Sequence, residues 1–338
     1  MNPLPSSVGL LGAGRMGRGI ALSFSLAGVR TVLLDMKDRT KEQFEAMAAD
    51  IHSELRVELG HMAEVGLFAS EHAETIAKRI SVVSLGEAVA AVKGIPLFFE
   101  GVPEVLTVKK TCLQWASRHV AADAIIASTT STILVDDLLG FVSNPQRFVN
   151  AHWLNPAYLM PLVEVSRSDL TSSDTLDRLL GWLKAIGKVP VCMKASPGYI
   201  VPRIQALAMN EAARMVEEGV ASAEDIDKAI KVGFGIRFAT LGLVEFIDWG
   251  GGDILYHASR YLSETLDKDR FKTPQNVEDN MKSGRNGLRD GIGFYDFRNM
   301  DVPAYRKARL SEFVGILKHL DLMPTTAVQL DTTVEKAV

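Results

Sequence analysis

The chain has 338 residues, of which 47% are hydrophobic and 23% are charged. This composition is that of an ordinary globular protein, and it excludes a disordered or fibrous chain. Lys and Arg number 37 against 41 Asp and Glu, which gives a net charge of −4. Such a balance provides neither the basic surface of a nucleic-acid-binding protein nor a polybasic membrane patch. At roughly 100–200 residues per domain, the length indicates two domains or one large domain.

Membrane, secretory and disulfide-rich classes are also disfavoured. No uncharged apolar run approaches the ~18–20 residues that a membrane-spanning helix needs. The first apolar stretch, residues 8–27, contains Arg15 and Arg18, so we expect no secretory signal. Two cysteines, Cys112 and Cys192, are too few for a disulfide scaffold. We therefore expect a cytoplasmic protein with reduced thiols that binds neither membranes nor nucleic acids.

The N-terminal part alternates short apolar runs with segments of helical periodicity. The strands predicted from these runs cover 7–11, 31–34, 80–83, 97–99, 125–127, 148–151, 162–165 and 189–193, and helices are predicted over 15–27, 105–119 and 173–186. Strands that alternate with helices favour a mostly parallel sheet with helices on both faces. The acidic segment 38–78 has helical periodicity and is predicted to be a helical insertion.

The pattern changes at Ser196–Pro197–Gly198, after which the sequence predicts helices alone. One helix is expected over 199–218. A capping-box-like start at Ser222 opens another, which is expected to end near Gly233. Further helices are expected over part of 241–266 and over 302–320. We therefore predict an α/β domain over 1–195, an all-helical substrate and dimerisation domain over 196–322, and a polar tail over 323–338.

A glycine-rich turn follows the first predicted strand and opens a helix. Gly12, Gly14 and Gly17 have the G-x-G-x-x-G spacing of dinucleotide-binding turns. In such turns the glycines allow a tight bend, a close approach of the pyrophosphate and close helix–strand packing. The first helical residues, Arg15 and Met16, lie where unpaired N–H groups face the phosphates. The sequence therefore predicts a Rossmann-type dinucleotide site.

The second predicted strand ends at Asp35, which indicates the choice of dinucleotide. A carboxylate at this place accepts hydrogen bonds from both ribose hydroxyls and repels a 2′-phosphate. Arg39 would favour a phosphate, but we interpret it as a solvated charge at a helix start. The sequence thus predicts NAD rather than NADP.

Two other clusters are given structural interpretations. Glycines at 284, 287, 291 and 293 follow no predicted strand, so we expect a surface loop rather than a phosphate-binding turn. His52, His61 and His72 do not share a helix face, so we expect solvated side chains and no metal site.

A histidine and a glutamate lie close together around another predicted strand. His152 follows the run at 148–151, and Glu164 lies inside the run at 162–165. A carboxylate within an apolar strand is costly to bury unless it is paired. A His–Glu pair suits alcohol oxidation, because the imidazole can remove the hydroxyl proton while the carboxylate stabilises the imidazolium. A core histidine in a structural ion pair is the alternative, and spacing does not decide between them.

These motifs together resemble the L-3-hydroxyacyl-CoA dehydrogenase family, including its lambda-crystallin and gulonate dehydrogenase-like branch. The resemblance extends from residue 9 to about 297. It is carried by H-W-L-N-P at 152–156 with L-V-E-V at 162–165, by A-S-T-T-S at 127–131, by E-G-V-P-E at 100–104 with Lys109, by S-P-G-Y-I-V at 196–201, and by G-I-G-F-Y at 291–295.

The resemblance implies a Rossmann-type domain, NAD as cofactor and a function in fatty acid metabolism. It implies that His152 is the general base and acid, that Glu164 orients it and that Ser131 binds the substrate oxygen. Asn155 would fix the substrate carbonyl or the surroundings of the histidine. Glu104 and Lys109 would lie beside the nicotinamide. The family is typically homodimeric through its helical domain, so a homodimer is expected.

Two departures from the family concern the substrate. Pro202 stands where the family usually has an active-site asparagine, so one substrate contact is missing or supplied otherwise. Arg237 stands where the acyl-CoA enzymes tend to be apolar, and it resembles relatives that act on free hydroxy acids. A guanidinium suits a carboxylate, although a local acid such as Glu245 is an alternative partner.

The helical insertion bears on the same question. It carries eight acidic residues between 42 and 77 and one basic residue, Arg56. Such a surface repels the phosphates of CoA. Three functions stay open: a dehydrogenase of a short free 3-hydroxy acid, which is slightly favoured, a 3-hydroxyacyl-CoA dehydrogenase proper, and a non-catalytic NAD-binding structural protein.

Overall fold

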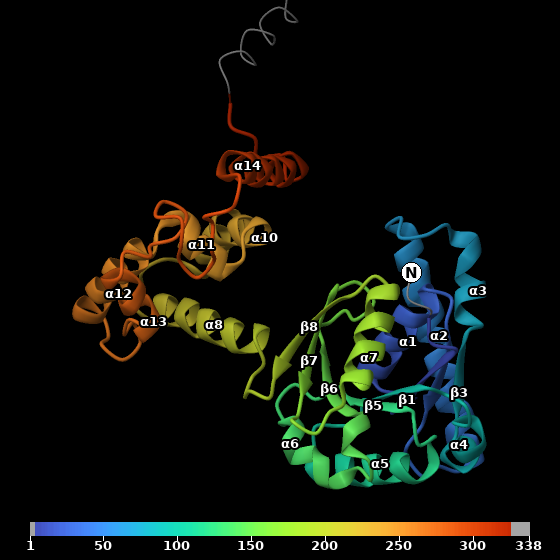
Figure 1. The fold of residues 1–338 in the computed structure, drawn as a ribbon. Coiled ribbons are helices and arrows are strands. Elements are labelled where there is room, and N and C mark those ends of the chain that lie inside the picture. Colours follow the sequence, from blue (N-terminus) through green and yellow to red (C-terminus); the bar gives the residue numbers. More distant parts are fainter. Residues whose placement is uncertain (1–3, 326–338) are drawn as a thin grey trace, which may run out of the picture. The chain divides into compact units, whose positions relative to one another are not determined.

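The computed structural model describes residues 4–325, which form two compact units that divide between Met209 and Asn210. The first unit contains one eight-stranded sheet in the order β3-β2-β1-β4-β5-β6-β7-β8 (Figure 1). The strands are β1 (Ser7–Leu11), β2 (Arg30–Leu34), β3 (Ile80–Val83), β4 (Leu97–Glu100), β5 (Ile125–Ser128), β6 (Phe148–Trp153), β7 (Leu162–Arg167) and β8 (Val189–Lys194). Neighbouring strands are parallel except β6 and β7, which are antiparallel. The predicted mostly parallel sheet is confirmed.

Helices cover both faces of this sheet (Figure 1). One face packs against α1 (Arg15–Leu26), α2 (Lys41–Glu64), α3 (Ala73–Ala77) and α7 (Ser173–Ala185). The other packs against α4 (Leu85–Ala91), α5 (Leu106–His119) and α6 (Val135–Leu138). Short 3₁₀ turns lie at η1 (Ser70–His72), η2 (Leu139–Phe141) and η3 (Pro145–Arg147). The predicted insertion is therefore the long helix α2 with η1 and α3.

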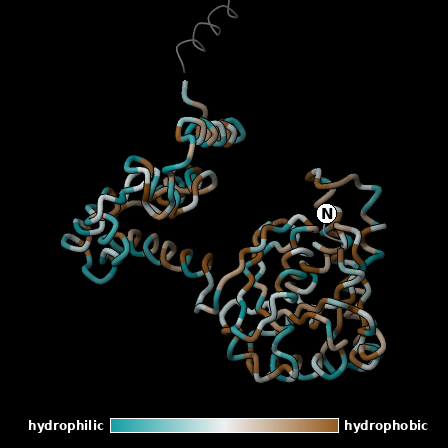
Figure 2. The backbone as a smooth tube through the Cα atoms, in the orientation of Figure 1, coloured by the Kyte–Doolittle hydropathy of each residue, from teal (hydrophilic) through white to brown (hydrophobic). Residues whose placement is uncertain are grey.

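A hydrophobic core lies on each face of the sheet, and side chains that alternate along the strands contribute to both. On β1, Leu10 belongs to the core under α1 and Leu11 to the core under α5. Successive strand side chains point to opposite faces, so an apolar run buries itself on both sides. The chain along these strands is predominantly hydrophobic (Figure 2). The central strands β1, β4, β5 and β6 are therefore buried along their whole length, whereas β8 at the sheet edge is largely exposed.

Three aromatic side chains fix the core beneath α1. The Phe99 ring lies 5.8 Å from that of Phe24 and 5.5 Å from that of Trp153, measured between centroids. Phe24 comes from α1, Phe99 from β4 and Trp153 from the end of β6. This cluster therefore ties the glycine-turn helix to the strand that carries His152.

The second unit is helical in the part that the structure describes. Helix α8 (Val201–Glu217) leads into it. It is followed by α9 (Ala223–Ala229), the π-helical segment η4 (Ile230–Gly235), α10 (Ile236–Thr240), α11 (Leu243–Gly250), α12 (Gly252–Thr265), α13 (Gln275–Lys282) and α14 (Val302–His319). Along α8 hydrophobic and hydrophilic residues alternate (Figure 2). Helix α13 was not predicted from the sequence.

The expected end of the α9 helix near Gly233 is wrong. The helical path continues through η4 and α10 to Thr240. Glycine ends a helix by taking a positive φ, but Gly235 has φ −60° and ψ −47°, and Gly233 is not among the positive-φ glycines. Because both keep negative φ, the chain widens into a π-turn instead of stopping.

The later glycine cluster forms a loop built around one buried carboxylate. Asp248 accepts hydrogen bonds from the backbone N–H groups of Phe294 (3.0 Å) and Tyr295 (2.7 Å). A Cβ on Gly287 or Gly293 would overlap Asp248. The glycines therefore allow close packing around Asp248, as a structural loop requires.

The two compact units divide inside α8, whereas the sequence places the domain boundary at residue 196. The boundary by function stays a prediction. Of the expected tail, residues 326–338 lie outside the described residues. Across residues 4–325, no helix combines the length and the apolar character needed to cross a membrane.

Replacing Phe99 should destabilise the first unit strongly. We expect Phe99→Ala to lower the free energy of unfolding by about 3–5 kcal/mol, because it leaves a cavity between Phe24 and Trp153. Urea denaturation followed by circular dichroism measures this change. Val65→Ala is the control, since Val65 is 83% exposed. Equal stability of the two variants would contradict the proposed core.

Candidate active site

The glycine-rich turn has the shape that a pyrophosphate site requires. Gly12 has φ +113°, and a Cβ there would lie 3.0 Å from the carbonyl oxygen of Gly101. A Cβ on Gly17 would overlap the Gly12 carbonyl. By contrast, a Cβ on Gly14 would meet nothing closer than 3.9 Å, so the space beside Gly14 is open. Close packing thus requires two of the glycines, and the third leaves room for a ligand.

Helix α1 presents its N-terminus to this open space. Gly14 is its N-cap residue and provides no side-chain cap, and the first turn contains no acidic residue. Arg15 and Met16 are the first two residues of the helix. The unpaired N–H groups and the helix dipole together favour an anion at this place. These residues fit the pyrophosphate of a dinucleotide.

Asp35 lies just beyond β2, as expected, but Arg39 is not a solvated charge. The Nε of Arg39 lies 2.5 Å from the Oδ2 of Asp35. The other oxygen, Oδ1, accepts a 3.3 Å hydrogen bond from the backbone N–H of Lys37. Asp35 is 5% exposed, so its charge is held in place and partly balanced by Arg39. The pair borders a cavity of about 430 Å³.

His152 and Glu164 form the expected pair. They face each other across the antiparallel β6–β7 ladder, and His152 Nδ1 lies 2.9 Å from Glu164 Oε2. His152 is 7% exposed and Glu164 is 1% exposed. The other oxygen of Glu164 accepts hydrogen bonds from the backbone N–H groups of Ile200 and Val201, each 2.9 Å long. The carboxylate therefore also caps the N-terminus of α8, where negative charge is stabilised.

Tyr199 covers the histidine. Its ring stacks on that of His152, with 4.8 Å between centroids and 24° between planes. Its hydroxyl donates a 2.8 Å hydrogen bond to the carbonyl of Thr130, and burial raises the pKa of this phenol. Tyr199 has φ +50°, a conformation costly for a residue with a side chain. The stack and the hydrogen bond hold it there, and they fix the imidazole plane.

Lys109 lies inside the protein rather than at a ligand surface. It is 0% exposed, and its Nζ contacts Glu100 Oε1 at 3.0 Å and Glu104 Oε2 at 3.1 Å. Glu100 also accepts a 2.5 Å hydrogen bond from the hydroxyl of Ser128 at the end of β5. The attraction of the two carboxylates offsets the desolvation cost of burying this cation. Lys109 therefore fixes the Glu104 carboxylate from the buried side.

Glu104 is the more accessible member of this network. Its side chain is 37% exposed. It accepts hydrogen bonds from the hydroxyls of Thr130 and Thr132, the latter 2.9 Å long. Burial raises the pKa of this carboxyl, but the hydrogen bond from Thr130 and the charge of Lys109 outweigh burial and hold the pKa below its ordinary value. Glu104 thus stays ionised beside the loop that carries Ser131.

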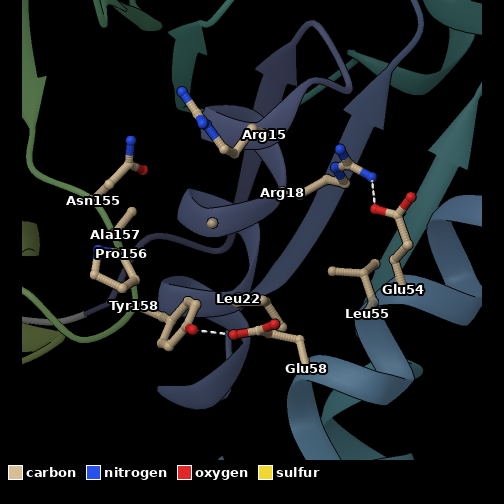
Figure 3. A pocket seen from close by; sticks show the side chains of 11 residues that line it. Arg15, Arg18, Leu22, Glu54, Leu55, Glu58, Asn155, Pro156, Ala157 and Tyr158 are labelled. Atoms are coloured by element: carbon tan, nitrogen blue, oxygen red, sulfur yellow. Dashed lines mark hydrogen bonds and ion pairs between the residues drawn. The ribbon is translucent and has the colours of Figure 1, made fainter. Parts of the chain in front are cut away.

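Ser131 and Asn155 lie on exposed loops that follow β5 and β6. Asn155 borders a pocket of about 370 Å³ between α1, α2 and the loop after β6 (Figure 3). Arg15 and Arg18 of α1 line the same pocket. Arg18 forms an ion pair with Glu54 of α2 (Figure 3). The structure thus brings Asn155 together with Arg15.

Arg237 belongs to the second unit, where Glu245 is not its partner. The guanidinium of Arg237 lies over the ring of Phe246, 5.7 Å from its centroid. Glu245 is bound instead by Arg309 at 3.0 Å and by the hydroxyl of Tyr305 at 2.6 Å. Among residues 4–325, no acidic group forms an ion pair with Arg237. The alternative in which Arg237 pairs with Glu245 is therefore wrong.

The chain matches two family models in sequence order. Residues 7–196 match the 3-hydroxyacyl-CoA dehydrogenase NAD-binding domain, and residues 198–297 match the C-terminal domain of the same family. The chain belongs to the 3-hydroxyacyl-CoA dehydrogenase family. It is accordingly an NAD-dependent oxidoreductase that acts on a CH–OH group, and the predicted cofactor, NAD, is confirmed.

Individual relatives cover nearly the whole chain. The hydroxyacyl-coenzyme A dehydrogenase of Sus scrofa mitochondria is 31% identical over 87% of this chain and 92% of its own. The 5-formyl-3-hydroxy-2-methylpyridine 4-carboxylate 5-dehydrogenase of Mesorhizobium japonicum is 27% identical over 93% and 98%. The crystal structure of a 3-hydroxyacyl-CoA dehydrogenase from Archaeoglobus fulgidus has a TM-score of 0.73 and 31% identity, and the match covers 94% of this chain and 100% of that one.

In this family member, sequence reasoning missed several side chains of the site. Tyr199 follows Pro197–Gly198 in the S-P-G-Y-I-V motif, and an aromatic residue at such a turn could have indicated a side chain of the site. Glu100 and Ser128 end two neighbouring parallel strands, so their side chains meet at one edge of the sheet. Pro202 is the second residue of α8, where a missing N–H costs nothing. The chemical roles of the site residues stay predictions.

Removing the Asp35 carboxylate should relax the choice of dinucleotide. We expect Asp35→Ala to raise the KM for NAD about tenfold, because it removes charge-assisted hydrogen bonds to the ribose. The same change frees Arg39 for a 2′-phosphate, so use of NADP should rise. Steady-state kinetics with both cofactors measures this, with Asp50→Ala on α2 as control. Native kcat/KM that is equal or better with NADP would contradict the role of Asp35.

Proposed function

We propose that this enzyme reversibly oxidises the 3-hydroxyl of a short, free 3-hydroxy acid to the ketone with NAD. The observation that carries the chemistry is the buried pair of His152 and Glu164, held at 2.9 Å. Such a pair provides a base whose tautomer and orientation are fixed, which is what removal of a hydroxyl proton requires. The chemistry supplied by bound nicotinamide is acceptance of a hydride.

The geometry assigns the two nitrogens of His152 different roles. Nδ1 is hydrogen-bonded to Glu164, so it carries the proton in the neutral ring. Nε2 is then the basic nitrogen, and no group among residues 4–325 bonds to it. During oxidation Nε2 takes the hydroxyl proton, and Glu164 stabilises the imidazolium that forms. During reduction the same proton returns to the substrate oxygen.

Ser131 and Asn155 are proposed to bind the reacting end of the substrate. Both are exposed and follow strands that end beside the His152 pair. The hydroxyl of Ser131 would donate to the substrate oxygen. Asn155 would bind the carbonyl group or support the histidine. Both roles rest on the motifs of the family and on the exposure of the two side chains.

Two charge patterns support a free acid as substrate. In the insertion, residues 42–77 carry eight acidic residues, and their one basic residue, Arg56, is itself paired with Glu74 at 3.3 Å. The insertion thus offers little to the phosphates of CoA. Arg237 has no acidic partner, and its planar guanidinium suits a carboxylate. The Mesorhizobium japonicum relative is likewise named for a carboxylate that is not a CoA ester.

A CoA thioester is the second candidate. Relatives from Sus scrofa and Archaeoglobus fulgidus are named as acyl-CoA enzymes. The pocket beside Asn155 also contains Arg15, whose guanidinium forms no ion pair within the described chain (Figure 3). A cation at that place suits a phosphate or a carboxylate, so this pocket alone does not distinguish the substrates.

A homodimer through the helical unit and a cytoplasmic location are proposed with this function. Several large apolar side chains of that unit are exposed, among them Ile254 at 62% and Leu310 at 58%. Exposed apolar area of this kind is typical of protein interfaces. Sedimentation measures the oligomeric state directly.

Removal of the imidazole should abolish most of the turnover. We expect His152→Ala to reduce kcat by about 10²–10⁴-fold, because it removes the proposed base, while the Kd for NAD changes little, because the glycine turn and Asp35 are unchanged. Glu164→Gln should reduce kcat less, since the base remains but the charge that stabilises the imidazolium is lost. Near-native turnover by His152→Ala, in a step shown to be chemical, would refute this mechanism.

Removal of the Arg237 guanidinium should separate the two substrates. We expect Arg237→Met to raise the KM for a free 3-hydroxy acid about tenfold or more, because a charge-assisted hydrogen bond is lost. CoA thioesters should be poor substrates of the native enzyme. Arg306→Met, on exposed α14, is the control. Efficient turnover of 3-hydroxybutyryl-CoA that the Arg237 variant retains would decide for the CoA ester.

A further inference from the structure

A second pocket in the first unit is separate from the candidate active site. It has a volume of about 460 Å³ and lies between the C-terminal part of α1, the η1–α3 segment and the start of β8. Its lining includes neither His152, Glu164 nor any residue of the glycine turn. Tyr158 is the one residue that it shares with the pocket of Figure 3.

The lining of this pocket contains basic side chains but no acidic ones. Lys188, Arg79 and His72 line it, and no carboxylate does. This contrasts with the insertion around it, which carries eight acidic residues. A cavity whose charged groups have one sign concentrates ligands of the opposite sign.

Lys188 is buried without a counter-ion. It is 7% exposed, and its Nζ donates to the carbonyl oxygens of Ala157 at 2.6 Å and Met160 at 2.9 Å. Its Nζ also lies over the ring of Trp153, 5.6 Å from the centroid. The two hydrogen bonds leave one of its three N–H groups without an oxygen acceptor, and among residues 4–325 no carboxylate lies within ion-pair distance. Burial lowers the pKa of this ammonium to about 8. An anion beside Lys188 would offset this cost of burial.

Arg79 adds further free donors. Its Nη1 donates a 3.2 Å hydrogen bond to the carbonyl of Ser25, and no acidic group among the described residues pairs with it. A guanidinium has five N–H donors, so most of them stay available. The rest of the wall is largely apolar, with Leu26, Phe68 and Ile186 among its residues.

We propose that this pocket binds a small amphipathic monocarboxylate at a site distinct from the active site. The carboxylate lies at Lys188 and Arg79, and the hydrocarbon body lies against Leu26, Phe68 and Ile186. A pocket of this size accommodates a ligand of several carbon atoms. Inorganic phosphate would satisfy the cations but leave the apolar wall unused.

Calorimetric titration of the full-length protein with hexanoate tests this proposal. Hexanoate lacks the 3-hydroxyl and so cannot be turned over. Hexanamide, with the same body and no charge, and inorganic phosphate are titrated in parallel. The protein variants are Lys188→Met and Arg79→Met, with Lys184→Met as the matched control, since Lys184 is an exposed lysine at the end of α7. His152→Ala reports on the active site.

We expect hexanoate binding to be weakened about tenfold or more by Lys188→Met and by Arg79→Met, because each removes a charge-assisted hydrogen bond. Lys184→Met and His152→Ala should bind as the native protein does, and hexanamide and phosphate should bind more weakly. If Lys188→Met fails to fold, Arg79→Met decides the outcome. The proposal is overturned by an absence of hexanoate binding, by unchanged binding in Arg79→Met, by phosphate binding as tightly, or by loss of binding in His152→Ala.

Discussion

The geometry of the candidate site depends on one buried carboxylate. Glu164 is 1% exposed and accepts three hydrogen bonds, one from His152 and two from the backbone where α8 begins. The desolvation cost of an unpaired carboxylate at such a depth would be prohibitive. The three donors offset this cost together, so each of them helps to hold the others in position. The same residue therefore orients the proposed base and fixes the path of the chain out of the sheet. Loss of Glu164 would disturb both.

Charged side chains in the rest of the first unit fall into two groups, paired and unpaired. The buried Lys109 of α5 contacts both Glu100 and Glu104, so that one cation fixes the acid that ends β4 and the acid in the loop after it. Elsewhere in the unit, the buried Lys188 and the partly buried Arg79 have no acidic partners among the described residues, and both border a pocket. Paired charges hold the structure rigid, whereas unpaired ones are available to a ligand.

The sequence predicted the sheet, the helical insertion and the glycine turn, because these depend on local patterns. Strand alternation and glycine spacing act over a few residues, so they are visible without the fold. The prediction of a helix end at Gly233 is wrong for the same reason. Glycine permits the left-handed conformation, but whether the chain adopts it depends on neighbouring helices, and here φ stays negative.

What the sequence alone determined is therefore the fold class, the family, NAD as cofactor and the pairing of His152 with Glu164. Which charged side chains pair, and which stay free, was decided by the tertiary structure. Arg39 binds Asp35, and Glu245 binds Arg309 rather than Arg237. Each charge has several possible partners along the chain, and a salt bridge requires atoms within about 4 Å. Such distances follow from the packing of whole helices, which no local pattern encodes.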